Sequence, residues 1–330
     1  MTTVNTTPRP PADPVNAARS GWLRSSLAAY GIVWAAAGIF IILSLTTPGF
    51  FAMGNVANIL DQQSAVLIAA APLTLVLIAG HFDVSLSAVY VTAPLVGIQV
   101  GISTGSMVWG TCAGVLAGLV AGLINATLIV VLRINSFIST LASSYVIMGI
   151  GYLVSAQSIL IPPSRTFRDF ATTKFLGLTS ATWLAFAVVA FFWVLLAATR
   201  FGRYVYATGA NPQAAILSGV RTGRIVMTTF MLTGAAAGFA GMVNASQSMS
   251  AQATDDFSFV FGALAAVVVG GTSIAGGAGA VWRTVAGALF IAMMNNGFNL
   301  NQVDPIYQRI ILGVVILVAV AIDAFARARR

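Results

Sequence analysis

Long apolar segments separated by short polar ones make up most of the chain. Ten of these segments approach the ~20 apolar residues that a straight membrane-spanning helix needs. They cover residues 27–46, 64–79, 84–101, 107–132, 137–155, 181–199, 225–243, 259–274, 284–298 and 307–325. Several are shorter than a full span, as expected where helices line a cavity inside the protein rather than lipid. The pattern predicts an all-α, polytopic helical membrane protein with about ten transmembrane helices.

The two ends of the chain are polar. Residues 1–26 contain Pro8, Pro10, Pro11 and Pro14, which disfavour a helix, and we expect them to form a disordered cytoplasmic tail. No short cleavable signal sequence precedes the first apolar segment, which is long enough to span the membrane and is expected to stay in the mature protein. Residues 27–325 are then the transmembrane domain, and residues 326–330 form a basic cytoplasmic tail.

Charged residues are scarce and unevenly distributed. The chain is 58% hydrophobic and only 7% charged, whereas a soluble domain has roughly a quarter charged residues. Its net charge of +8 does not indicate nucleic-acid binding, because the arginines lie at the ends of apolar segments. An even number of spans puts both termini on one side, and the arginine excess predicts that this side is the cytoplasm. The residues expected there are Arg9, Arg19, Arg24, Arg133, Arg200, Arg203, Arg221, Arg224, Arg283, Arg327, Arg329 and Arg330, against Arg165, Arg168, Lys174 and Arg309 outside.

One polar segment, residues 200–224, contains four of these arginines and no acidic residue. Within it Asn211 is a good helix N-cap, Pro212 suits the first helical position, and Gly219 can end a short helix in the left-handed conformation. Small side chains give this helix a smooth face, formed by Ala214, Ala215 and Ser218. We interpret it as a helix that lies along the membrane surface and docks into a groove on a soluble partner. The alternative is an ordinary cytoplasmic loop whose arginines only set the topology.

Glycines recur at regular spacing in two of the predicted spans. Gly110, Gly114, Gly118 and Gly122 repeat every fourth residue, and Gly234 and Gly238 repeat the spacing later in the chain. Such smooth stripes allow helices to approach closely, and we interpret both as packing surfaces. A further glycine-rich stretch, residues 270–279, is predicted to be a cytoplasmic turn.

Lysine, histidine, cysteine and glutamate, which are common in active sites, are nearly absent. The only lysine, Lys174, lies between Thr173 and Phe175, so the chain has no Walker A sequence and does not hydrolyse ATP in that way by itself. A single histidine, His81, and a single cysteine, Cys112, exclude a His/Cys zinc cluster and an internal disulfide, and the chain has no glutamate. We therefore expect no enzyme activity, metal or cofactor, and we expect Cys112 to be a small packing residue.

Ion-coupled transport normally needs an ionisable group within the membrane, but every aspartate lies near the end of a predicted span. Asp83, in the sequence GHFDVSLS, is interpreted as either a buried ligand or a cap for the following helix. Uncharged amides are more frequent within the spans and at their ends. They bind hydroxyl groups without the desolvation cost of a charge, so they suit a path for a neutral polyhydroxylated solute, although each also fits simple interhelical hydrogen bonding. The candidate path residues are Gln63, Asp83, Asn125, Asn295, Asn296 and Asn299.

Five segments together resemble one family. They are residues 55–87, 134–155, 202–220 (GRYVYATGANPQAAILSGV), 262–281 (GALAAVVVGGTSIAGGAGAV) and 293–300 (MMNNGFNL). In this order and spacing they are similar to the ribose-type, monosaccharide permeases of ABC importers. The resemblance extends from about residue 50 to residue 323, nearly the whole membrane region.

The resemblance implies a set of partners and a role for the polar segment. A second permease copy or a sister permease completes the path, an ABC ATPase subunit binds from the cytoplasm, and an extracytoplasmic sugar-binding protein delivers the solute. The residues expected to contact the ATPase are Gly209, Asn211, Ala214, Ala215, Ser218 and Gly219. The chain would then lie in the cell (inner) membrane, surrounded by lipid, as a permease subunit for a monosaccharide or polyol.

Three departures from the family pattern concern specificity. Pro212 and Gln213 replace the acidic residues that usually follow the docking asparagine. The GGIDLSVG signature reads GHFDVSLS, with His81 and Leu86 among the changed residues, and Ala278 stands where a basic residue is common. Permeases for branched-chain amino acids or nucleosides therefore remain the alternative within ABC transport. A self-sufficient secondary transporter is the alternative outside it.

Overall fold

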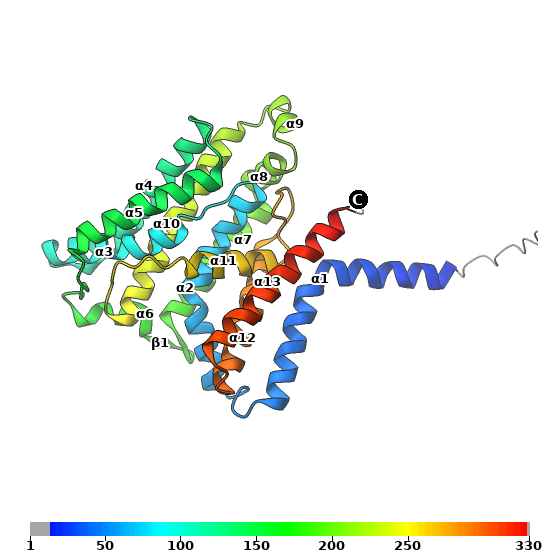
Figure 1. Cartoon of the computed structure of the whole chain (residues 1–330), viewed down its shortest axis with the longest axis horizontal. Coiled ribbons are helices and arrows are strands. Elements are labelled where there is room, and N and C mark those ends of the chain that lie inside the picture. The colour runs from blue at the N-terminus through cyan, green and yellow to red at the C-terminus, as the bar shows by residue number, and fades with distance from the viewer. Residues whose placement is uncertain (1–13, 329–330) are drawn as a thin grey trace, which may run out of the picture.

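The computed structural model describes residues 14–328 and consists almost entirely of helices (Figure 1). Two short strands form a hairpin in which Lys174 pairs with Thr179 and Phe175 with Leu178. In chain order the elements are α1 (Pro14–Thr46), α2 (Met53–Ile78), α3 (Leu86–Thr104), α4 (Met107–Val130), α5 (Ser136–Ser155), η1 (Arg165–Phe167), α6 (Asp169–Thr172), β1 (Lys174–Phe175), β2 (Leu178–Thr179), α7 (Ser180–Ala198), α8 (Arg200–Ala210), α9 (Pro212–Leu217), α10 (Thr222–Ser248), α11 (Ser258–Val269), α12 (Val281–Leu300) and α13 (Pro305–Ala328).

Each predicted span overlaps one helix of the structure. Within residues 14–328, six helices are long and apolar enough to cross a membrane: α2, α3, α4, α5, α7 and α10. The apolar parts of α1, α11 and α13 are shorter. The all-α, polytopic fold is thus confirmed, while the number of ten spans and the side on which the termini lie stay predictions.

The structure differs from the predictions at both ends of the chain. Helix α1 begins at Pro14, so residues 14–26 are helical rather than part of a disordered tail, and residues 1–13 lie outside the described part. Proline is tolerated there because the first helical turn does not use its backbone N–H. Of the predicted basic tail, residues 326–328 belong to α13 and residues 329–330 are not described.

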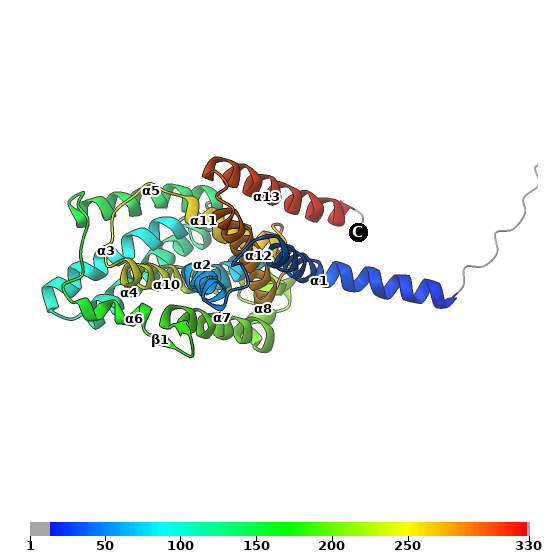
Figure 2. The same ribbon diagram turned by 90° about the horizontal axis from the view of Figure 1, so that it is seen from below.

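Helix α2 lies in the middle of the molecule (Figures 1 and 2). Nearly every residue from Ser64 to Ile78 is buried, which agrees with a sequence that is apolar on all sides of the helix. Its first turns, residues 53–63, carry Asn55, Asn58, Asp61 and two glutamines. Their polarity explains why the apolar pattern placed the start of this helix too late.

The two glycine stripes are packing surfaces, as predicted, and they pack against each other. A Cβ on Gly118 would lie 2.2 Å from the carbonyl oxygen of Gly234, and a Cβ on Gly238 would lie 2.7 Å from that of Gly114. Backbones can approach this closely only where both helices lack side chains. The stripes therefore join α4 to α10.

Helix α11 is much shorter than the predicted span 259–274, because it ends at Val269. Gly270 is its C-cap, and Gly271 follows in the left-handed conformation with φ +85°. At a rise of about 1.5 Å per residue, its 12 residues cross only part of a bilayer. Residues 270–280 continue the chain as a partly buried loop.

The molecule has two opposite ends. The α9 end holds α8, α9 and the C-terminal ends of α2 and α4, since Gly209 approaches Ile78 and Gly223 approaches Val130 (Figure 1, top). The hairpin end, opposite to it, holds the β1–β2 hairpin and a β-bridge between Leu160 and Ala251.

Candidate coupling site and solute path

Helix α9 has the capping that its sequence predicted. The Oδ1 atom of Asn211 accepts a hydrogen bond of 3.0 Å from the backbone N–H of Ala214, and Pro212 is the first helical residue. At the other end Gly219 has φ +83°. Val220 N–H donates to the Ala215 carbonyl and Gly219 N–H to that of Ile216, at 3.0 and 2.9 Å. These two bonds form a Schellman motif, so local sequence defines both ends of this six-residue helix.

The outward face of α9 is not the one that the small residues indicated. Ala215 is buried, with 5% of its surface exposed, so it packs the helix onto the rest of the protein. Ala214 and Ser218 are exposed, but so are Ile216 and Leu217, at 57% and 88%. These two apolar side chains were missed because the sequence argument looked for a smooth face. A surface helix that exposes adjacent large apolar side chains is a candidate for docking.

Helix α8, which precedes α9, was also missed. It is strongly amphipathic, so the search for long apolar segments could not detect it. Thr199 caps its start through a hydrogen bond from Gly202 N–H to Thr199 Oγ1. Its helical periodicity was the signal available in the sequence: Gly202, Val205 and Thr208 are buried, while Arg200, Arg203 and Tyr204 are exposed.

Near the C-terminal end of α8, Gly209 touches two other segments at backbone level. A Cβ on Gly209 would lie 1.7 Å from the carbonyl oxygen of Ile78 and 2.7 Å from the backbone nitrogen of Gly277. Gly277 N–H donates to the same Ile78 carbonyl at 2.8 Å. Gly80 and Gly276, both with positive φ, also meet here. We call this contact of Gly80, Gly209, Gly276 and Gly277 the glycine junction.

The glycine junction connects α8 to two elements of the bundle. Gly80 follows the C-terminus of α2, and Gly276 and Gly277 belong to the loop between α11 and α12. Tyr206 strengthens the connection, because its hydroxyl donates to the Gly279 carbonyl at 2.7 Å. Helix α8 is therefore in direct contact with α2 and with the loop after α11.

Two predicted path residues, Asp83 and Asn125, belong to one buried polar cluster. Oδ1 of Asp83 accepts from the backbone N–H of Ser85 at 3.0 Å and from its hydroxyl at 2.5 Å. The Asn125 amide donates to Ser85 Oγ at 2.7 Å, and its oxygen accepts from Ser143 Oγ at 2.5 Å. All but Ser143 are almost fully buried. The cluster joins the α2–α3 connection to α4 and α5.

Asp83 combines features of both interpretations. Helix α3 begins at Leu86 with Ser85 as N-cap, so Asp83 does not occupy the capping position. It forms instead an Asx turn onto Ser85 N–H, directly before the helix. The neighbouring backbone N–H groups of Phe82 and Val84 donate to the hydroxyls of Ser136 and Thr140 on α5. Side chains thus satisfy the irregular backbone inside the bundle, as a membrane interior requires.

The other predicted path residues do not join this cluster. Asn296 on α12 exchanges two hydrogen bonds with Asn55 on α2, at 2.9 and 3.0 Å. Asn299 accepts from the Gln308 amide at 3.0 Å. Asn295 and Gln63 are half-buried on α12 and α2. Asn296 and Asn299 thus form hydrogen bonds between helices, from α12 to α2 and to α13, which is the structural role considered for the amides.

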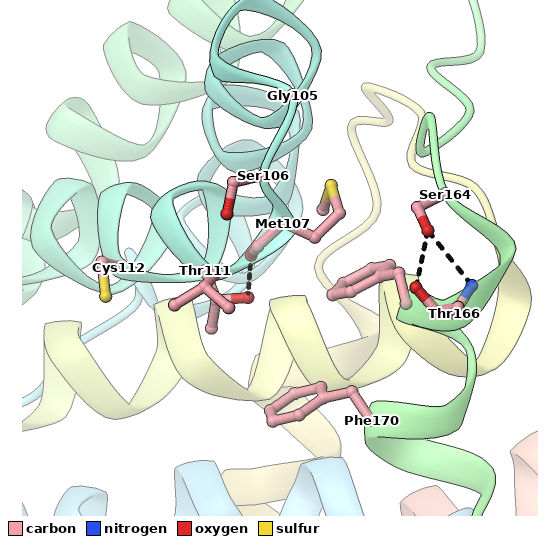
Figure 3. A pocket seen from close by; sticks show the side chains of 10 residues that line it. Gly105, Ser106, Met107, Thr111, Cys112, Ser164, Thr166 and Phe170 are labelled. Carbon is pink, nitrogen blue, oxygen red and sulfur yellow. Dashed lines mark hydrogen bonds between the residues drawn. The ribbon is translucent and has the colours of Figure 1, made fainter.

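A cavity of about 460 Å³ opens at the hairpin end, between the start of α4 and the η1–α6 segment (Figure 3). The hydroxyls of Ser164 and Thr166 lie 2.6 Å apart on one side of it, and Thr111 and Cys112 line the other. Cys112 is exposed, so the expectation that it is a packing residue is wrong. It lies only about one and a half turns into α4, facing a space that the sequence pattern does not reveal.

Comparison with known proteins decides the family. Residues 55–320 match the family model described as branched-chain amino acid transport system / permease component. The chain belongs to this family. It is a multi-pass membrane protein of a family of transport components, and the predicted resemblance to sugar permeases is confirmed by its relatives.

The ribose import permease protein RbsC of Escherichia coli (strain K12) is 34% identical over 297 residues, which cover 86% of this chain and 90% of that protein. RbsC of Bacillus subtilis (strain 168) is 34% identical over 287 residues, 86% of this chain and 89% of that protein. The L-arabinose ABC transporter permease protein AraH of Azospirillum brasilense is 32% identical over 325 residues, 98% of this chain and 96% of that protein. No solved structure is significantly similar to this chain.

Proposed function

We propose that this chain is the membrane-spanning subunit of an ABC importer in the cell membrane, and that it forms the path for a monosaccharide or polyol. The family description names branched-chain amino acids, but the relatives that cover most of this chain are named as ribose and arabinose permeases. One structural observation carries the coupling part of this proposal. An exposed apolar helix, α9, is joined through α8 and the glycine junction to the buried helix α2.

In this proposal the α9 end faces the cytoplasm, both termini lie on that side, and ten helices cross or enter the membrane. The arginines support this orientation. Arg200, Arg203, Arg221 and Arg224 are all exposed around α8 and α9, as the positive-inside rule requires of cytoplasmic segments. Arg165, Arg168 and Lys174 lie near the hairpin end.

A partner ATPase binds α9 and moves α8. Ile216 and Leu217 enter a groove on the ATPase, the arginines of residues 200–224 surround that contact, and Ala215 fixes α9 to the permease. ATP binding pulls or pushes α8, and the glycine junction passes the displacement to α2 and to the loop after α11. Nucleotide thereby biases the chain between two conformations. Gly209, Asn211 and Gly219 act by shaping this unit, Asn211 through its side-chain cap on α9, rather than by contacting the ATPase.

Two further partners complete the importer. The hairpin end receives an extracytoplasmic sugar-binding protein, and a second copy of this chain or a sister permease forms the other half of the path. ATP hydrolysis belongs to the ATPase subunit, because the present sequence has no Walker A lysine.

The proposal is tested with the variant Leu217→Glu. The importer is purified gently from native membranes, and the proteins that co-purify with it are identified by mass spectrometry. Because Leu217 is 88% exposed, the variant should reach the membrane in normal amount but lose the co-purifying ATPase and the ATP-dependent uptake. The matched control is Gln213→Glu, which puts the same charge on an exposed residue in the first turn of α9, where the helix dipole favours it. If the Leu217→Glu variant keeps its ATPase, the docking proposal is wrong.

Uptake measurements separate the alternatives. Competition by unlabelled leucine or uridine, with none by monosaccharides, would assign the chain to the amino-acid or nucleoside permeases. Uptake by the purified chain in liposomes without nucleotide, driven by a proton or sodium gradient, would make it a secondary transporter.

A further inference from the structure

A small cavity at the start of α11 has the chemistry of a sugar-binding site, although none of the predicted path residues lines it. It lies between α2, α3 and α11, has a volume of about 280 Å³, and is lined by Val66, Tyr90, Thr254, Asp256, Ser258 and Phe259 among others. Drug-sized ligands occupy cavities of about 300–1,000 Å³, so this one suits a single small solute.

The apolar part of the cavity is an aromatic pair. The rings of Tyr90 on α3 and Phe259 on α11 are stacked, with centroids 3.7 Å apart and planes 9° from parallel. Both side chains are only partly buried. The face of an aromatic ring carries partial negative charge, and the C–H groups on one face of a pyranose or furanose carry partial positive charge. Tyr90 adds a hydroxyl that donates and accepts hydrogen bonds.

The polar part is a carboxylate at the cavity rim. Asp256 is exposed, and its two oxygens accept from the backbone N–H and the hydroxyl of Ser258, each at 2.7 Å. These bonds, and the more distant charge of Arg309, lower the pKa of Asp256, so the group is ionised at neutral pH. Each carboxylate oxygen keeps a lone pair for another donor. The rim therefore favours a neutral solute with hydroxyl donors and repels anions.

Both aromatic residues lie on helices that are fixed to their neighbours. Val260 N–H donates to the buried Ser87 hydroxyl at 2.8 Å, which ties the first turn of α11 to α3. One turn along α3, the carbonyl of Tyr90 is so close to α10 that a Cβ on Gly241 would lie 2.3 Å from it. The opposite end of α11 leads into the loop whose Gly276 and Gly277 form the glycine junction. The cavity thus lies at one end of the helix whose other end is connected to α8.

We propose that this cavity is a low-affinity binding subsite for a neutral monosaccharide or polyol, in which the Tyr90–Phe259 stack contacts C–H groups of the solute and Asp256 binds its hydroxyls. This proposal rests on the importer function proposed above and names the residues that recognise its solute. Low affinity follows from the role, because a solute on a transport path must leave the site as readily as it enters.

The direct test is protection of a cysteine from a water-soluble maleimide. Thr254→Cys, in the Cys112→Ala background, places a single thiol at the cavity rim. In membranes that contain the assembled importer, millimolar D-ribose, L-arabinose or ribitol should slow its modification, whereas ribose 5-phosphate should not. Adding Asp256→Asn should abolish the protection, and adding the neighbouring Asp255→Asn, which does not line the cavity, should leave it intact.

Uptake by the assembled importer gives a second test. At limiting sugar, Asp256→Asn should lower the uptake rate about tenfold or more, the range expected for lost bonds to a charged group. Phe259→Leu should lower it about threefold to tenfold. Phe261→Leu is the control on the same helix, because Phe261 is 56% exposed and lies outside the cavity. The amount of each variant in the membrane is measured in parallel.

Two results would overturn the subsite. The first is ATP-dependent sugar uptake by the parent protein with no protection by any neutral sugar or polyol. The second is uptake by Asp256→Asn and Phe259→Leu that equals that of their controls. Protection by leucine or uridine alone would reject the sugar assignment. These results are distinct from a failure of the importer proposal. The protection assay needs no ATP hydrolysis, and the contact with the ATPase is measured separately with Leu217→Glu.

Discussion

At the scale of single residues, two glycines near α9 are required for different reasons. Gly219 has φ +83° but open space around it, since no atom lies within 4 Å of a Cβ built on it. Gly209 has an ordinary helical conformation, but a Cβ there would overlap the Ile78 carbonyl oxygen at 1.7 Å. Glycine is therefore required at position 219 by its backbone conformation and at position 209 by close contact with another segment.

Alanine substitutions distinguish the two reasons. Gly219→Ala should cost about 1 kcal/mol of stability, the approximate penalty for a side chain in the left-handed region, and should leave uptake nearly normal. Gly209→Ala should lower uptake far more, because the added methyl separates α8 from the Gly277–Ile78 hydrogen bond. Uptake per unit of protein in the membrane, with ATPase co-purification as a control for docking, measures the difference. Equal effects of the two substitutions would contradict the glycine junction as a coupling contact.

Asn125 is expected to contribute to stability through the side chains that it bonds. It is fully buried and bridges Ser85 and Ser143. Asn125→Ala should destabilise the protein by about 1–3 kcal/mol, because it removes two hydrogen bonds from the buried network and leaves a cavity. Thermal unfolding in detergent measures this, with Asn244→Ala as the control, because Asn244 is exposed on α10. An equal loss of stability in both variants would show that the buried network contributes little.

At the scale of helices, glycines bring α4 close to α10, and α11 connects two separate parts of the molecule. The glycine stripes of α4 and α10 bring carbonyl groups within reach of the facing backbone, so the two helices form one rigid unit. Helix α11 is held at one end through Ser87 and at the other through the loop that enters the glycine junction. Between its ends α11 packs closely on α12, since a Cβ on Gly287 would lie 2.2 Å from the Ala266 carbonyl oxygen. Helix α11 therefore connects the coupling end to the proposed subsite as one packed element.

The rigidity of the α4–α10 pair is tested by adding one methyl group. Gly118→Ala should destabilise the protein by about 1–3 kcal/mol through overpacking, since its Cβ would lie 2.2 Å from the Gly234 carbonyl oxygen. Gly149→Ala on α5 is the matched control, because no atom lies within 4 Å of its Cβ and alanine favours a helix. Thermal unfolding of both variants in the same detergent compares them. A melting temperature of Gly118→Ala at or above that of Gly149→Ala would contradict the packing.

At the scale of the whole molecule, the proposed orientation is open to a simple chemical test. Cys112 is the only cysteine, and it is exposed in the cavity at the hairpin end (Figure 3). In intact spheroplasts, a membrane-impermeant maleimide should modify Cys112 without permeabilisation. Leu217→Cys in the Cys112→Ala background should react only after the membrane is opened. The reverse pattern would show that the α9 end lies outside the cell and that the ATPase proposal fails.

Local sequence determined those features that depend on a few neighbouring residues. Asn211, Pro212 and Gly219 define α9 because a cap acts within one turn of the helix. Long apolar segments defined the buried and membrane-facing helices, because burying apolar side chains is favourable whatever their partner. The glycine stripes likewise indicated close packing, since only glycine allows backbones to come so near.

Tertiary structure alone decided which residues meet. Whether Ala215 or Leu217 faces outward depends on the side of α9 that rests on the protein, and nothing in a six-residue helix specifies that side. The candidate path amides look alike in sequence, yet Asn125 joins Asp83 in a buried cluster while Asn296 pairs with Asn55. The stack of Tyr90 on Phe259 joins residues far apart in the chain. Such contacts follow from the simultaneous packing of many helices, which no local pattern encodes.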